Sequence, residues 1–335
     1  MAYPSATDII LPGQRQLTGD DDSLLLTMFS GEVLNVFRDK LTMMNRHRVI
    51  PVGAGKDFQW PKIGQATTAY HTRGESLLDD TKGYLSDIEH TDTTITVDNI
   101  LLSSIFLDNF QEMLRHFETR SEYSYQLGAA LARKMDKHLF QLACASAQAG
   151  VSDFATPMNA DKTKGARIAK AGVSGTDATS VGKLIDSMVD AASNFAQKDV
   201  PMDGLCFFVR PEQYYALQRE GSLLNTDFGN AGNGSQASGS ILRGYGFEIS
   251  WSNFLPDTDL SAAEPGVRND YTGDFTQTVA LAMHRDAMGT VMRENVQTET
   301  DYQVERQGTL LVSKVTCGHG VLRPECLAVI EDSAI

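Results

Sequence analysis

Two short stretches carry residue types that enzymes use for catalysis. The stretch CGHGVLRPEC places His319, Arg323 and Cys326 close together near the end of the chain, and MHRDAMG sets His284–Asp286 in direct succession. A cysteine thiol acts as a nucleophile where a base removes its proton, and an acid and a base side by side suit proton transfer. One hypothesis is therefore an α/β enzyme with a pocket near His284–Asp286 or near His319–Cys326.

A structural interpretation accounts for the first stretch without a reaction. Gly318 and Gly320 give the backbone around His319 the freedom that a tight reversal needs, and Pro324 favours an extended residue before it. The pattern predicts a strand, a turn that contains His319, and a buried strand that begins at Cys326 and runs to residue 330. The sequence identifies no base for the Cys326 thiol.

The second stretch also has a structural interpretation. Successive side chains on a strand point to opposite faces, so His284–Asp286 would converge on one substrate only in an unusual turn. The seven histidines show no H-x-x-x-H spacing, and the four cysteines form no C-x-x-C pair. We therefore predict free thiols, no metal site, no cofactor and no catalytic residue.

The composition narrows the class of protein. The chain has 335 residues, 41% apolar and 21% charged, as in ordinary folded proteins, and this length suggests about two domains. Its 43 acidic residues exceed its 29 basic ones and give a formal charge of −14, which argues against nucleic-acid binding as the main task. No apolar run approaches the ~20 residues of a membrane span, and no signal peptide is recognisable. We predict no membrane partner and synthesis in the cytosol.

Residues 46–100 have an extended character. Their return leg is rich in Thr, Ile and Val, which predicts a long two-stranded hairpin with an irregular tip. An isolated hairpin buries too little apolar surface to be stable in water. Trp60, Ile63 and Tyr70 on this hairpin therefore need a partner surface, which another copy of the chain can supply.

Apolar residues spaced three or four apart predict three helices. One runs from Ser23 to Lys40, and the pattern fits a helix in a loose polar N-terminal arm, residues 1–45, and a surface helix of a globular domain equally well. A second, of roughly 28 residues after an N-cap at Ser121, would span about 42 Å and serve as a spine for the elements that pack on it. The third and most clearly amphipathic covers residues 180–195.

The second half of the chain is predicted to contain an α/β unit between a long loop and a long strand. Residues 152–179 are small, polar and aperiodic, which predicts a long loop, and Val296–Cys317 is predicted to be one long strand. Between them, apolar runs and a helix opened by Pro211 predict a compact α/β unit. The strands of that unit are predicted at Leu205–Val209, Phe247–Trp251 and Thr278–Met283.

The order of these elements, together with five short motifs, resembles the major capsid proteins of T7-like short-tailed phages (podoviruses), which have the HK97-like capsid fold. The motifs occur in family order between Leu24 and Ile330. They are FSGEVLNVF (Phe29–Phe37), RSEYSYQLG (Arg120–Gly128), YGFEI (Tyr245–Ile249), MHRDAMGTV (Met283–Val291) and GHGVLRPE (Gly318–Glu325).

The resemblance implies an α+β protein with the HK97-like capsid fold. That fold has an N-terminal arm, an extended β-hairpin loop, a spine helix with a peripheral domain, and an α/β axial domain. The implied division gives the arm residues 1–45 and the extended loop residues 46–100. The spine helix and peripheral domain take 101–175, completed by 293–317, and the axial domain takes 176–292, completed by 318–335.

The resemblance also implies a function. It implies a structural subunit, not an enzyme, that self-assembles into pentamers and hexamers of an icosahedral head around double-stranded DNA. The implied partners are further copies of the chain, a scaffolding protein during assembly and a portal protein, with room for a decoration protein. Packaged DNA would meet the acidic shell only by weak, non-specific proximity.

The implied location is the virion, after assembly of a procapsid in the host cell cytoplasm and its maturation. A shell subunit must contact its neighbours through side chains that its own fold leaves uncovered. We expect intersubunit contacts at Trp60, Ile63, Tyr70, Arg73 and Arg323.

Overall fold

The computed structural model describes most of the chain from residue 42 onward. The predicted arm helix, Ser23 to Lys40, and the motif Phe29–Phe37 lie outside the described residues. The described residues are 42–44, 46–78, 83–86, 88–109, 120–152, 154, 162–220, 234–235, 240–241, 243–262 and 264–333.

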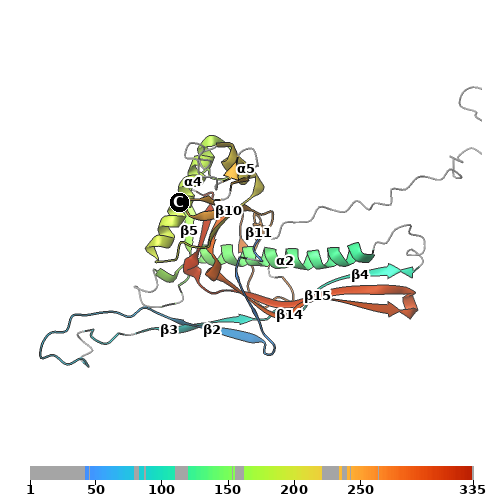
Figure 1. Ribbon diagram of the computed structural model, residues 1–335, viewed down its shortest axis with the longest axis horizontal. Coiled ribbons are helices and arrows are strands. Elements are labelled where there is room, and N and C mark those ends of the chain that lie inside the picture. Colours follow the sequence, from blue (N-terminus) through green and yellow to red (C-terminus); the bar gives the residue numbers. More distant parts are fainter. Residues whose placement is uncertain are drawn as a thin grey trace, which may run out of the picture.

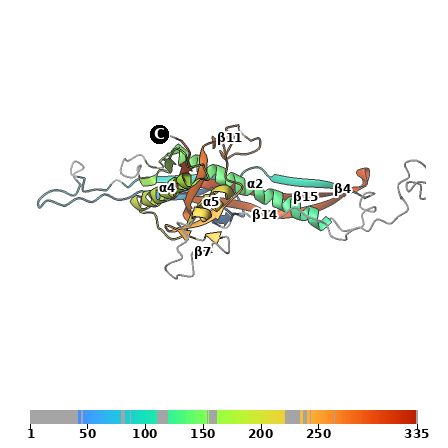
Figure 2. The same cartoon turned by 90° about the horizontal axis from the view of Figure 1, so that it is seen from above.

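The described elements form a compact unit with projections on two opposite sides (Figure 1). One projection is the two-stranded pair of β2 (Asp57–Ile63) and β3 (His90–Thr96). The other is formed by β4, β14 and β15 beside the long helix α2 (Arg120–Ala149). Figure 2, seen from above, shows the same two projections on either side of the compact unit.

A six-stranded sheet forms the main core, in the order β5–β16–β13–β6–β10–β9. Its three middle strands are buried along their whole length, because helices cover both faces. Phe208 meets Phe140 of α2, with ring centroids 5.3 Å apart, while Phe207 on the opposite face packs at 5.8 Å from Phe247. The strands are β5 (Ala166–Ala169), β16 (Leu327–Glu331), β13 (Thr278–His284), β6 (Leu205–Val209), β10 (Phe247–Trp251) and β9 (Arg243–Gly244).

Two helices belong to this unit, α4 (Ala178–Gln197) and α5 (Pro211–Glu220). The buried face of α4 carries apolar residues three or four apart, which is the pattern that predicted it. Its Phe195 lies 6.1 Å from Phe247, ring to ring, so α4 covers the face opposite to α2. These helices and the three predicted strands of the unit are confirmed, although β13 continues to His284.

A four-stranded sheet, in the order β1–β14–β15–β4, packs on the first half of α2. Leu131 and Met135 of α2 pack against Val315 and Cys317, and Leu127 packs near the far end of the sheet. The helix has 30 residues and spans about 45 Å, so the predicted spine helix is confirmed. The strands are β1 (Arg48–Pro51), β14 (Met288–Gln303), β15 (Gly308–Val321) and β4 (Leu101–Asp108).

Several predicted boundaries were wrong. Ser121 lies inside α2 and is not its N-cap, because the helix already includes Arg120. The predicted single strand Val296–Cys317 is two antiparallel strands, β14 and β15, which reverse at the 3₁₀ turn Val304–Arg306. The predicted loop 152–179 contains β5, which pairs in parallel with β16.

Short elements complete the described structure. Pairing of β11 (Asp259–Leu260) with β12 (Gly273–Asp274), and of β7 (Gly234–Ser235) with β8 (Ser240–Ile241), forms two small hairpins. Further 3₁₀ turns lie at Arg285–Ala287 and Pro324–Cys326, so Cys326 ends a turn and the buried strand begins one residue later. No helix among the described residues is both long and apolar enough to cross a membrane.

The predicted hairpin in residues 46–100, hereafter the extended loop, is confirmed for β2 and β3, which pair over seven residues. The first strand of this segment, β1, does not belong to the hairpin, because it pairs in parallel with β14. The loop therefore leaves the body of the subunit after β1, runs out along β2, and returns along β3 to the four-stranded sheet.

Candidate functional site

The GHG motif lies within β15, so the prediction that it forms a turn was wrong. Neither Gly318 nor Gly320 has a positive φ, and both keep the extended register of the strand. A Cβ atom on Gly318 would overlap the Thr96 carbonyl oxygen and lie 2.9 Å from its carbonyl carbon, and one on Gly320 would lie 2.5 Å from Ile95 Cδ1. The glycines therefore allow the end of β3 to pack directly on the backbone of β15.

His319, between the two glycines, points to the opposite face of the strand, where it is 1% exposed. Its Nδ1 lies 2.8 Å from Oγ1 of Thr290, the residue directly opposite on β14. The same Thr290 oxygen lies 2.7 Å from Nε2 of His47, whose Nδ1 lies 2.8 Å from the Met43 carbonyl oxygen. We call His47, Thr290 and His319 the histidine bridge.

The hydrogen-bond direction in the histidine bridge follows from its ends. A carbonyl oxygen only accepts, so His47 Nδ1–H donates to Met43, and the free lone pair of Nε2 accepts from the Thr290 hydroxyl. The Thr290 oxygen then accepts from His319 Nδ1–H, and His319 Nε2 faces the Cys317 thiol at 3.7 Å. Both imidazoles are satisfied in their neutral form.

Burial favours that neutral form. It lowers the pKa of His319 to about 3, with His47 and His138 adding repulsion, and it also lowers the pKa of His47. Burial raises the pKa of the Cys317 thiol to about 12, so the thiol keeps its proton at neutral pH.

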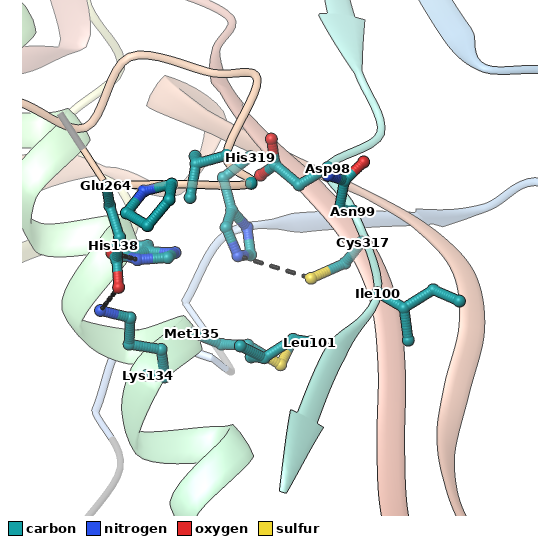
Figure 3. Close-up of a pocket in the computed structure, with 13 residues that line it drawn as sticks. Asp98, Asn99, Ile100, Leu101, Lys134, Met135, His138, Glu264, Cys317 and His319 are labelled. Atoms are coloured by element: carbon teal, nitrogen blue, oxygen red, sulfur yellow. Dashed lines mark hydrogen bonds and ion pairs between the residues drawn. The ribbon is translucent and has the colours of Figure 1, made fainter.

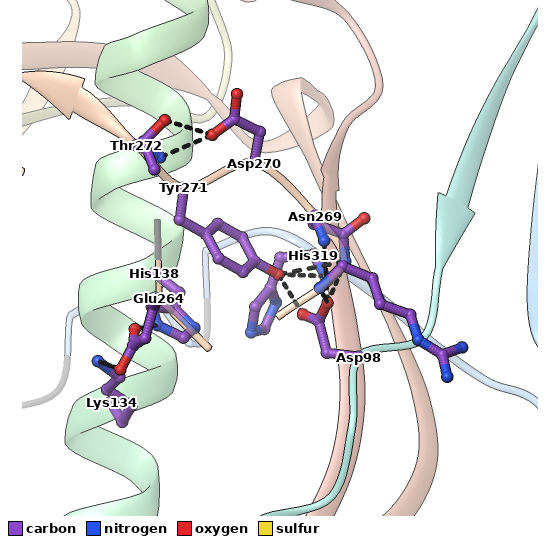
Figure 4. Close-up of polar contacts among 10 residues, drawn as sticks. Asp98, Lys134, His138, Glu264, Asn269, Asp270, Tyr271, Thr272 and His319 are labelled. Atoms are coloured by element: carbon purple, nitrogen blue, oxygen red, sulfur yellow. Dashed lines mark hydrogen bonds and ion pairs between the residues drawn. The ribbon is translucent and has the colours of Figure 1, made fainter. Parts of the chain in front are cut away.

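Asp98, two residues after β3, is the centre of a second set of contacts (Figure 4). Its carboxylate accepts from the backbone N–H groups of Arg268 and Asn269, at 2.8 and 3.0 Å, and from the Tyr271 hydroxyl at 2.6 Å. The Tyr271 oxygen in turn accepts from the His319 backbone N–H at 3.2 Å. Burial, and then the charge of Asp98, raises the pKa of Tyr271, so its hydroxyl remains a donor.

A cavity of about 120 Å³ lies beside these residues, between α2 and the end of the extended loop (Figure 3). His138 of α2 lines it and stacks on Tyr271, with ring centroids 4.3 Å apart. Glu264 accepts from Lys134 at 2.6 Å and lies 3.2 Å from His138 Nε2. The described residues contain no cluster of three or more His, Cys, Asp or Glu placed to hold a metal ion.

The segment that leads into the extended loop is held by a buried carboxylate. Asp136 of α2 accepts from the backbone N–H groups of Thr42, Met43 and Met44, at 3.3, 3.0 and 3.2 Å. Burial raises the pKa of Asp136, and these three donors partly offset that effect. The segment therefore presents the Met43 carbonyl to His47.

The stretch His284–Asp286 lies at the end of β13 and in the following 3₁₀ turn, where its polar atoms make structural contacts. His284 Nδ1 accepts from the Asp286 backbone N–H, and Nε2 donates to the Asp203 carbonyl at 2.8 Å. The Asp286 carboxylate pairs with Arg48 at 2.6 Å, which lowers the pKa of Asp286. Both ring nitrogens of His284 are thus occupied, and the Asp286 carboxylate, 4.0 Å from His284 Nδ1, is engaged by Arg48.

His319 and Cys326 are also not brought together. Cys326 belongs to the large core around the six-stranded sheet, whereas the thiol beside His319 is that of Cys317. Burial raises the pKa of Cys326 to about 12, which does not suit a nucleophile. All four cysteines are free and buried.

The predicted contact residues lie on the extended loop and near its root. Ile63 is 68% exposed, and Tyr70 and Arg73 are also exposed. Trp60 is half-buried, with its ring centroid 4.4 Å from that of Phe58. Arg323 is exposed and lines a groove of about 530 Å³ together with residues 60–65 of the loop.

The tip of the extended loop is ordered by its own side chains while its apolar groups face outward. Tyr84 donates to Glu75 and accepts from the Thr72 backbone N–H at 3.0 Å, and His71 packs on the Tyr84 ring. Further exposed apolar residues there are Leu77, Leu78, Leu85 and Ile88.

The sequence profile of the Gp10A-like major capsid protein family matches residues 59–331. The chain belongs to this family. It is 28% identical to the major capsid protein of Escherichia phage T7 over 333 residues, covering 93% of this chain and 92% of that protein. It is also 28% identical to the major capsid protein of Enterobacteria phage T3, covering 95% and 94% of the two chains.

Solved structures agree with the family assignment. The capsid structure of the cyanophage P-SCSP1u superposes with a TM-score of 0.81 at 29% identity and covers 100% of this chain and 99% of that one. The mature capsid of bacteriophage PhiM1, at 19% identity and a TM-score of 0.73, shares the fold over 92% of this chain. The fold is the HK97-like capsid fold, and the chain has the structural role of a phage major capsid protein. The enzyme hypothesis finds no support.

Sequence reasoning missed most of the polar residues that join the extended loop to the body of the subunit. His47, Thr290 and His319 are separated by 243 and 29 residues, and Asp98 lies 173 residues from Tyr271. The spacing of residues along the sequence cannot predict contacts between positions so far apart. The one available signal was the GHG motif, where two glycines flank a histidine within a strand.

Proposed function

We propose that the chain assembles into pentamers and hexamers of an icosahedral head through its extended loop, which lies over a neighbouring subunit. The observation that carries this proposal is the exposed apolar surface of the extended loop at Ile63, Tyr70 and Leu78, which the described part of its own subunit leaves uncovered. Uncovered apolar groups of this kind are typical of interaction sites.

We assign the structural units accordingly. The peripheral domain comprises α2 with the four-stranded sheet, and the axial domain comprises α4, α5 and the six-stranded sheet. Residues 166–169 go with the axial domain rather than with 101–165, because β5 pairs with β16. Trp60 contributes by fixing the root of the loop, and Arg323 by lining the groove beside that root.

The proposed assembly takes place in the host cytoplasm on a scaffolding protein and around a portal protein, and the product is the shell of the virion. The net charge of −14 keeps the shell from holding the packaged DNA tightly, because phosphate contacts need Lys and Arg. The subunit has no catalytic task in this scheme. Its interior contacts serve to hold the extended loop in position.

Co-expression with the cognate scaffolding protein tests this function. Wild-type protein is expected to sediment as large particles that appear as closed shells in electron micrographs. Ile63→Asp combined with Tyr70→Ala is expected to remain folded, because both side chains are exposed, and to yield no shells. Tyr215→Ala, an exposed residue of α5, is the matched control and should assemble. Shells formed equally well by the loop variant would overturn the proposal.

A further inference from the structure

The two ends of the extended loop meet at one residue of β15. His47 immediately precedes β1 on the outgoing side and reaches His319 through Thr290. Asp98 follows β3 on the returning side and reaches the His319 backbone through the Tyr271 hydroxyl. The Asp98 backbone N–H also donates to the Cys317 carbonyl at 3.1 Å. His319 therefore connects both ends of the loop to the body of the subunit.

All hydrogen bonds of the histidine bridge are satisfied only while His47 and His319 are both neutral. One added proton on His47 reverses both hydrogen bonds to Thr290, so that His319 Nε2–H points at the Cys317 sulfur, which is a weak acceptor. A second proton leaves the single Thr290 oxygen between two N–H donors, with no acceptor for its own hydrogen. Either step also places charge in a buried site.

The surrounding groups do not offer that charge a partner. Among the described residues, no carboxylate hydrogen-bonds to either ring of the bridge, because each nearby carboxylate is engaged elsewhere. Asp98 accepts hydrogen bonds from Tyr271 and Asn269, and Asp136 accepts from the backbone of residues 42–44. Glu264 contacts Lys134 and His138. The nearby positive groups oppose protonation as well. Arg285 lowers the pKa of His47, and His138 lowers that of His319. Lys134 lowers the pKa of the neighbouring His138.

We propose that the histidine bridge is an acid-sensitive device, which holds both ends of the extended loop on β15 near neutral pH and releases them when His47 and His319 become protonated. The proposal goes beyond shell formation, since it concerns the single subunit.

At the returning end the release is local, because that end rests on little apolar packing. Ile95 and Val97 of the returning end pack with Val291 and Leu322 in a small cluster that is separate from the large core of the six-stranded sheet. Loss of the polar contacts therefore opens the returning end of the loop while the large core persists.

The direction with pH follows from linkage. The folded pKa of His319, about 3, lies below its ordinary value of 6.5, so the open state binds more protons between these values. The contribution of His319 to stability is complete above pH 6.5 and is lost as pH falls, with opening favoured about tenfold per pH unit. Asp136 has the opposite effect on the pH dependence. Its pKa is raised in the folded state, so the folded state takes up the Asp136 proton at a higher pH than the open state does, and acid then favours the closed form.

Hydrogen–deuterium exchange on the full-length chain tests the proposal, after correction for intrinsic exchange rates. Between pH 6.5 and pH 4.5, opening at the Asp98 amide, which donates to the Cys317 carbonyl of β15, is expected to increase about 50-fold. Residues 327–331 of β16 serve as the internal reference and should keep their protection. Equal loss of protection at Asp98 and in residues 327–331, or no loss at Asp98, would overturn the proposal.

A second arm removes the titration but keeps the two hydrogen bonds to Thr290. His47→Gln with His319→Asn places amide groups near the positions of Nε2 and Nδ1, and neither amide binds a proton in this pH range. Protection of the Asp98 amide in this double variant should then change with acid by no more than the scatter between repeats. His90→Gln, an exposed residue at the start of β3, is the control and should behave as wild type. A double variant that keeps the wild-type acid response contradicts the proposal. If the double variant does not fold, the exchange of the wild-type protein at pH 6.5 and pH 4.5 tests the proposal alone.

Discussion

Gly318 of β15 lies directly against Thr96 at the end of β3, so closely that any Cβ atom at residue 318 would overlap the Thr96 carbonyl group. The contact joins the extended loop to the body of the subunit at the point where the loop returns. The position of a loop that projects far from the subunit is thus fixed by a backbone-to-backbone contact at its root.

Gly318→Ala should displace the loop root without straining the backbone, because residue 318 does not have a positive φ. Overpacking at such a site costs about 1–3 kcal/mol in the free energy of unfolding. Chemical denaturation measures that cost, and particle yield with the scaffolding protein should fall. The matched control is Gly182→Ala in α4, where a Cβ meets nothing within 4 Å and helix propensity favours alanine. A Gly318→Ala protein as stable as this control would contradict the proposed close contact.

Asp98→Asn should weaken the returning end of the loop. The carboxylate accepts from Arg268, Asn269 and Tyr271, and an amide keeps one acceptor oxygen at most and adds two donors. We expect a loss of about 2–3 kcal/mol in the free energy of unfolding, measured by denaturant titration. Asp270→Asn, a neighbouring exposed carboxylate that bonds only locally to Thr272, should cost less than about 1 kcal/mol. Similar losses for the two variants would show that the Asp98 contacts are unimportant.

The pair Arg48–Asp286 should contribute an acid-sensitive part of the stability. The hydrogen bond from Arg48 lowers the pKa of Asp286 below 3.8, so the folded state favours the carboxylate. Its contribution is present above pH 3.8 and is lost as pH falls through the lower folded pKa. The difference in unfolding free energy between wild type and Asp286→Asn should therefore shrink from about pH 5 to about pH 3. Asp199→Asn, in the exposed pair with Lys162, is the comparison and should alter stability little at either pH.

The four cysteine thiols should be unreactive in the native protein. All are buried, and burial raises the pKa of both Cys317 and Cys326 to about 12. A thiol reagent at pH 7.5 should label the native chain slowly and all four thiols after unfolding in urea. Ala69→Cys on the exposed tip of the extended loop provides a rapidly labelled reference. Rapid native labelling of Cys326 would instead revive the nucleophile hypothesis.

The local sequence pattern was sufficient to predict the elements in which apolar residues recur at a regular spacing. The apolar spacing of α4 and the alternation along β2 and β3 follow from which face each element buries, and that is visible in the order of residue types. The end of a strand is less visible. The predicted strand Val296–Cys317 is broken by a reversal at Val304–Arg306, a sequence without glycine or proline.

The sequence by itself determined the spine helix, the extended loop, the buried strands and the family of the chain, because each rests on residues that are neighbours along the chain. It left the meaning of GHG undecided, since two glycines around a histidine suit a turn as well as a close approach by another segment. Only the tertiary structure brings β3 onto Gly318 and Gly320, and His47 and Thr290 onto His319. Such contacts join segments up to 243 residues apart, and the packing of whole elements decides them.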